Sequence, residues 1–234
     1  MKLSEINDNE MVDDEYLVKQ IITRIDKECK QIINEMGGWS TWLTENIRVK
    51  DQYNLIRGMR PTSLYGIRSA RSQRTPKDTW PEIHQIIDDW FFQKFGYRYR
   101  SNAIFAVSNV HTAESYGHPC LIFPRGHFRF CYSPDVEDLW DGVKMTLHKN
   151  FKSTVQKLAT IESDEHFEQA VNQIISKLEG AGYTETNLRE AIGYVYGSSE
   201  IMIGCKDYYY VKAKWFNKHY VPVVEHMLES GEIK

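Results

Sequence analysis

The chain has 234 residues, of which 41% are hydrophobic and 26% are charged, and its formal net charge is −3. This length and apolar content allow a full core, while the 4 scattered cysteines have no paired CxxC spacing and predict neither a disulfide framework nor a cysteine-based metal site. No stretch approaches the roughly 18 apolar residues of a membrane span, and residues 1–8 lack the apolar run of a secretion signal, so we expect a cytoplasmic protein without membrane association.

The first predicted element is a long helix over residues 12–36. Apolar residues recur there at helical spacing, and the pair Gly37–Gly38 provides a stop signal. The remainder of the chain shows no internal repeat or clear linker. We therefore expect two parts, a helical N-terminal extension over residues 1–50 and one larger domain over residues 51–234.

An Arg-Gly pair, Arg57 and Gly58, lies within the apolar segment at residues 55–60. A guanidinium presents a rigid fork that matches phosphate oxygens. Glycine has no side chain, so its backbone N–H and C=O can approach a flat ring closely. From Arg57 to Lys77 there are six basic residues and no acidic residue. This run is either a solvated loop or a surface for the phosphates of a small ligand, for nucleic acid or for an acidic protein.

Helices and short strands alternate through the rest of the chain. A capping box at Thr79–Glu82 opens a helix that ends at Gly96. Three strands follow, at 103–108, 119–123 and 127–132, with residues 124–126 as the turn between the last two. Later elements are helices at 165–178, 187–192 and 215–228 and strands beginning at 200 and 208. This mixture predicts an α+β fold.

Two further segments carry polar residues beside apolar strands. Ser108 ends the strand at 103–108, and Glu200 opens the strand that continues through Ile201 and Ile203. Cleavage of a glycosidic bond passes through an oxocarbenium-like sugar, and a carboxylate bonded to the sugar 2-OH stabilises the developing positive charge. Glu200 is the candidate for this role.

Together, Arg57, Ser108 and Glu200 resemble the Arg, Ser and Glu signature of the mono-ADP-ribosyltransferases, and the surrounding pattern looks most like the members that bacteriophages encode. The resemblance covers roughly residues 55–210. It implies a split β-sandwich α+β core and a glycosyltransferase that cleaves NAD as co-substrate and releases nicotinamide. The ADP-ribose would be moved onto a macromolecular acceptor, a protein or a nucleic acid, in the host cytoplasm.

The resemblance also implies roles for individual residues. Arg57 would hold the NAD phosphates or the adjoining ribose, and Gly58 would present its backbone to the nicotinamide carboxamide. Ser108 would support the active-site strand and contact NAD, and Glu200 would steer the oxocarbenium ribose.

The acceptor is expected near the loop that leads to Glu200. The resemblance makes Tyr194 and Tyr196 candidate contacts to the acceptor. Members that modify arginine usually carry Glu or Gln two residues before the catalytic Glu, where this chain has Ser198. A serine hydroxyl is too short and uncharged to orient a guanidinium well, so arginine is not the expected acceptor.

Two alternatives come from other classes of protein. One is a non-catalytic nucleic-acid-binding protein that uses the basic segment from Arg57 to Lys77. The weaker one is a metal-dependent nuclease built on Asp135, Asp141 and Lys144. We expect no metal, because the spacing of the histidines matches no short ligand pattern. Consumption of NAD distinguishes the transferase from both alternatives.

Overall fold

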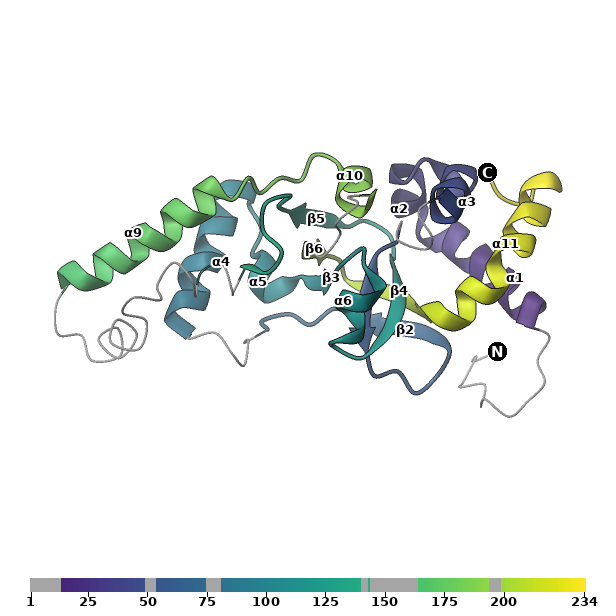
Figure 1. The fold of residues 1–234 in the computed structure, drawn as a ribbon, viewed down its shortest axis with the longest axis horizontal. Coiled ribbons are helices and arrows are strands. Elements are labelled where there is room, and N and C mark those ends of the chain that lie inside the picture. The colour runs from purple at the N-terminus through teal and green to yellow at the C-terminus, as the bar shows by residue number, and fades with distance from the viewer. Residues whose placement is uncertain (1–13, 49–53, 75–80, 140–142, 144–163, 194–198) are drawn as a thin grey trace.

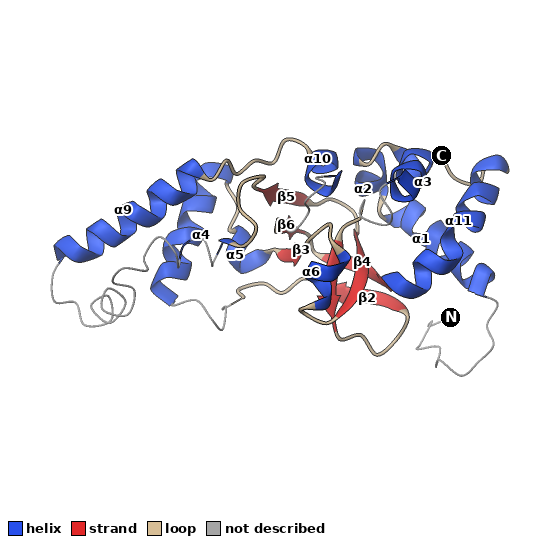
Figure 2. Cartoon of the chain, in the orientation of Figure 1, coloured by secondary structure: helices blue, strands red, loops and turns tan. Residues whose placement is uncertain are grey.

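The computed structural model shows an elongated molecule with its strands in the middle and helices at both ends (Figures 1 and 2). It describes residues 14–48, 54–74, 81–139, 143, 164–193 and 199–234. The strands form two antiparallel sheets, so the predicted α+β class is confirmed at this level. Among the described helices, none combines the length and the apolar character that crossing a bilayer requires.

One end of the molecule consists of α1 (Asp14–Glu28), α2 (Lys30–Glu35), α3 (Gly38–Arg48) and α11 (Ala213–Glu229). The helix predicted at 12–36 is thus divided at Cys29. In an unbroken helix the carbonyl of Glu28 would accept the N–H of Ile32, but here it accepts the N–H of Gly126 at 2.8 Å. α3 begins at Gly38 after a turn in which Gly37 has φ +87°. It lies in the helical extension predicted over residues 1–50, but it was not predicted as a separate helix.

The larger sheet has the strand order β1 (Ile56–Met59), β4 (His118–Pro124), β7 (Asp207–Lys212) and β2 (Tyr65–Ser69). All three neighbouring pairs are antiparallel. β2 lies within the basic run that begins at Arg57, so part of that run is an edge strand. The sheet shares one continuous apolar core with α1, α2, α3 and α11. The predicted N-terminal extension therefore packs directly on the strands.

The smaller sheet has the order β3 (Ile104–Ala106), β6 (Ile201–Gly204) and β5 (Arg129–Tyr132). The predicted strands around the turn at 124–126 exist, but β4 and β5 lie in different sheets and do not pair as a hairpin. Arg125 explains the separation. Its side chain binds Glu28 at 2.8 Å and Asp207 at 3.1 Å, which fastens the turn to α1 and β7 before the chain continues to β5.

The two sheets are joined where β1 meets the residue after β3. Ile56 N donates to Val107 O at 2.7 Å, and Val107 N donates to Ile56 O at 2.8 Å. Asn109 then caps the short helix α6 (Val110–Glu114) by accepting the N–H groups of His111 and Thr112. This junction matters because it connects the segment that carries Arg57 to the segment that carries Ser108.

The opposite end of the molecule has a second apolar core. It is formed by α4 (Pro81–Phe95), α5 (Tyr99–Asn102) and α9 (Asp164–Gly180) together with the outer face of the smaller sheet. Phe91 and Tyr99 are fully buried there. The short helix α10 (Leu188–Gly193) lies above the smaller sheet, where Leu188 and Ile192 join the first core (Figure 1).

Candidate functional site

Arg57 lies on β1 beside the junction between the sheets. Its Nη1 donates to the carbonyl of Phe105, on β3, at 2.6 Å. Burial lowers the pKa of Arg57 below its usual value, while Tyr208 and Glu200 act against this shift. The guanidinium is thus held at the junction by one of its five N–H donors, next to the other charged groups of the site.

Gly58 approaches α6 so closely that no side chain fits. A Cβ at this position would lie 2.2 Å from the carbonyl oxygen of Ala113 and 2.7 Å from Cβ of Tyr116. In an antiparallel pair, the backbone groups of alternate residues point to the same side. The backbone N–H and C=O of Ile56 bind Val107, so the backbone groups of Gly58 also point away from β4. Gly58 lines the pocket described below.

Ser108 lies between the Val107 bridge and the α6 cap at Asn109, and it is only 2% exposed. Ser108 is therefore a buried residue of the junction between the two sheets. Its predicted role as a support for the active-site strand stays a prediction.

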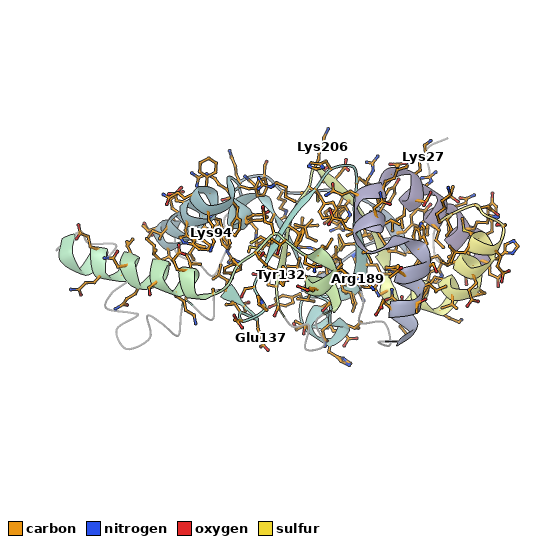
Figure 3. The ribbon with its side chains drawn as sticks, turned by 90° about the horizontal axis from the view of Figure 1, so that it is seen from above. Lys27, Lys94, Tyr132, Glu137, Arg189 and Lys206 are labelled. Atoms are coloured by element: carbon orange, nitrogen blue, oxygen red, sulfur yellow. The ribbon has the colours of Figure 1, made fainter. Side chains whose placement is uncertain are left out.

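Glu200 comes immediately before β6. Its backbone N–H donates to the carbonyl of Glu137 at 3.0 Å; Figure 3 labels Glu137 at one edge of the molecule. Its Oε2 accepts a charge-assisted hydrogen bond from Nη1 of Arg100 at 3.2 Å, and the two side chains are 23% and 6% exposed. Burial raises the pKa of Glu200 above its ordinary value, and the positive charge of Arg100 opposes that rise.

Arg100 is a residue of the site that the sequence patterns did not predict. Arg100 is held by Asp88, a carboxylate on α4 that is only 2% exposed. Asp88 Oδ1 accepts the backbone N–H groups of Arg100 at 3.0 Å and Ser101 at 3.3 Å, so it fixes the start of α5 and with it the direction of Arg100. One sequence feature could have indicated Arg100: Tyr and Arg alternate over residues 97–100, directly after the predicted end of a helix at Gly96.

The aromatic ring of Phe105 lies near two guanidinium groups. Cζ of Arg74 is 4.3 Å from the ring centroid, and Cζ of Arg100 is 5.1 Å from it. Arg74 is held in place by its own backbone N–H, which donates to Ser101 O at 2.8 Å. Since the Phe105 carbonyl binds Arg57, this one residue of β3 brings three arginines together.

A pocket of about 430 Å³ opens beside this cluster. Its walls come from β1, β2, the segment after β2 and the start of β3. Four arginines line it: Arg57, Arg68, Arg71 and Arg74. Within the described ranges, none of the ion pairs joins any of these four to a carboxylate. Burial and the neighbouring arginines both lower the pKa of Arg74. The pocket is therefore a strongly cationic site with room for an anionic ligand.

The pairing of the strands brings the three signature residues to one region. Ala106 lies opposite Ile201, so continuing the register sets Val107 against Glu200. Val107 in turn bridges to Ile56, next to Arg57. Arg57, Ser108 and Glu200, which are far apart in the sequence, therefore lie on or just beyond the ends of adjoining strands. The predicted acceptor contacts, Tyr194 and Tyr196, fall outside the described residues.

Other predicted features bear on the alternatives. Where the structure describes the chain, no group of three or more His, Cys, Asp or Glu side chains is arranged to hold a metal ion. Of the residues proposed for a nuclease, Asp141 and Lys144 lie outside the described ranges. Comparisons of the chain with protein-family models, with curated proteins and with solved structures each gave no match.

Proposed function

We propose that this protein is an NAD-dependent mono-ADP-ribosyltransferase that transfers ADP-ribose from NAD to a macromolecular acceptor. The observation that carries the proposal is the convergence of Arg57, Ser108 and Glu200 beside a pocket lined by arginines. A split β-sandwich architecture belongs to the same proposal; the two antiparallel sheets and their junction at Val107 are compatible with it.

The pocket offers groups that can bind two parts of NAD, the pyrophosphate and the nicotinamide carboxamide. Arg57 and Arg74 provide guanidinium groups for the pyrophosphate, because their forks match phosphate oxygens. The backbone N–H and C=O of Gly58 provide a donor and an acceptor for the nicotinamide carboxamide. Because Gly58 has no Cβ, α6 can pack closely against it. The same lack of a side chain lets a ligand approach the Gly58 backbone.

Glu200 then provides the charge that the transition state requires. The bond from ribose C1 to the nicotinamide nitrogen breaks, nicotinamide leaves with the bonding electron pair, and C1 acquires oxocarbenium character. A Glu200 carboxylate bonded to the ribose 2-OH stabilises that positive charge. The acceptor nucleophile forms the new bond to C1 and loses a proton.

Arg100 has a positioning role in this mechanism. It binds Oε2 of Glu200 from the side of α5, which fixes the carboxylate and favours its ionised form. A buried arginine of this kind, held through Asp88, orients the carboxylate before NAD arrives.

The proposal is tested by incubating the chain with NAD labelled in its adenine ring together with a bacterial lysate. The label should appear on macromolecules, and digestion with nuclease or protease identifies the acceptor class. The Glu200→Gln variant is the control and should label little. Retention of all label in free NAD would reject the transferase.

A second candidate, a nucleic-acid-binding protein without catalysis, is favoured by one observation, the four arginines in the pocket. It would bind polyanions with a steep dependence on salt and leave NAD intact. The same incubation separates the two functions, because only the transferase moves the adenine label onto macromolecules.

A further inference from the structure

The cationic surface extends beyond the pocket. Arg60, Arg68 and Arg71 are exposed, and Nη2 of Arg68 donates to the carbonyl of Arg60 at 3.3 Å, so these two residues are neighbours. Arg68 and Arg71 also line the pocket, where they meet the less exposed Arg57 and Arg74. We call Arg60, Arg68 and Arg71 the arginine track. It connects the open surface to the interior site.

The positive charge of this region exceeds what NAD can neutralise. The pyrophosphate of NAD carries two negative charges, and the nicotinamide ring is itself positive. Four arginines line the pocket and Arg60 adds another outside it, while the nearby carboxylate of Glu200 is paired with Arg100. Cations that remain close together repel one another, as the lowering of the Arg74 pKa by its arginine neighbours indicates. A second ligand with several negative charges would relieve this repulsion.

The chemistry of the track favours phosphodiesters over the carboxylates of an acidic protein. Every cation in the track and the pocket is an arginine, whose planar group binds phosphate bidentately and also stacks on bases. Apolar surface also lies close to the charges, because Ile67, the neighbour of Arg68 on β2, is 48% exposed. A cationic groove with side chains that contact unpaired bases is typical of sites for single-stranded nucleic acid.

The size of the pocket indicates one strand rather than a duplex. About 430 Å³ is the volume of a small-molecule site, so a nucleotide unit fits and a base-paired helix does not. We propose that the arginine track binds single-stranded nucleic acid and leads one end of it to the pocket as the ADP-ribose acceptor. The acceptor role rests on the proposed function, whereas binding of the strand does not.

The test measures binding without NAD. A short fluorescent single-stranded oligonucleotide, as RNA or as DNA, is titrated with the parent and with the triple variant Arg60→Gln, Arg68→Gln and Arg71→Gln. All three side chains are exposed, so the variant should fold. Loss of three phosphate contacts should weaken binding by about tenfold or more and reduce the slope of log affinity against log salt by about 2.

A matched control removes the same charge elsewhere. Lys27, Lys30 and Lys218 are exposed on α1, α2 and α11, at the far helical end where Figure 3 labels Lys27. Changing all three to Gln should leave oligonucleotide binding and its salt slope as in the parent. Preference between RNA and DNA then identifies the kind of single strand.

Three results would overturn the proposal: equal binding by the parent and the track variant, equal binding of duplex and single strand, or tighter binding of polyglutamate than of an oligonucleotide of equal charge. The last would identify an acidic protein as the partner. Failure of the proposed function would show separately, as oligonucleotide binding without any release of nicotinamide from NAD.

Discussion

Two groups of arginines in this molecule differ in their partners. At the turn after β4 and on β5, Arg125 binds Glu28 and Asp207, and Arg129 binds both carboxylate oxygens of Glu185. In the pocket, Arg57 and its neighbours face one another and a backbone carbonyl. The paired arginines complete the fold, and their charges are neutralised within it. None of the ion pairs among the described residues joins a pocket arginine to a carboxylate, so these arginines are available to an anion from outside.

The strongest test of this distinction changes Glu200, the carboxylate that acts on both Arg57 and Arg74. Glu200→Gln should lower ADP-ribosyl transfer by on the order of 10²-fold or more, because its charge matters chiefly in the transition state. Affinity for NAD, measured by calorimetry, should change little. Glu185→Gln is the matched control, since it removes a carboxylate from a structural arginine pair and should leave transfer unchanged. Equal transfer by the Glu200 variant and the parent would remove Glu200 from the mechanism.

The next test keeps the positive charge at position 57 but replaces the planar guanidinium with an ammonium group. Arg57→Lys should weaken NAD binding by about 1–3 kcal/mol, because an ammonium cannot bind phosphate as a bidentate fork. Calorimetry on a variant with an unchanged circular dichroism spectrum measures the loss. Unchanged affinity would exclude Arg57 as a phosphate ligand.

The pH dependence of transfer tests the Arg100–Glu200 pair. In the proposed mechanism Glu200 acts in its ionised form, so transfer should fall as pH falls through the pKa of that carboxyl group. Burial raises this pKa and Arg100 opposes the rise. Arg100→Gln should therefore move the acid limb of the profile to higher pH, and Arg100→Lys, which keeps the charge, should move it less. A profile that stays in place for both variants would show that Arg100 does not act through Glu200.

The smallest effect is expected at a structural arginine. Arg125→Gln breaks two ion pairs that are about one-third exposed, so it should cost about 1 kcal/mol or less of unfolding free energy. The melting temperature should fall by about 2–4 °C or less. NAD cleavage should be unchanged, and a loss of cleavage comparable to that of Arg57→Lys would remove the distinction between the two groups.

Local sequence patterns predicted most elements of the fold. The periodicity of α4, α9 and α11 and the apolar runs of β4 and β6 are properties of short segments, and the structure confirms them. The break at Cys29 depends instead on the N–H of Gly126, and the separation of β4 from β5 depends on partners of Arg125 in distant elements. Contacts of this kind are absent from any local pattern.

The same limit applies to the site. Arg57 and Glu200 stand in recognisable short motifs, so the sequence identified them as candidates. Arg100 could be identified as a site residue only from the structure, because Asp88 on α4 and Glu200 before β6 together define its position. The sequence predicted that the basic run could form a surface for anions. It did not predict that β2 and the segment after it bring arginines of this run together with Arg57 in one pocket.

The proposed cleavage of NAD, with Glu200 as the essential carboxylate, is tested by release of nicotinamide from NAD. Release is measured with the purified parent and with Glu200→Gln at one pH above the acid limb. We expect time-dependent release by the parent and a loss of about 10²-fold or more in the variant. NAD that stays intact with the folded parent, in the presence and absence of a single-stranded oligonucleotide and a lysate, would contradict it.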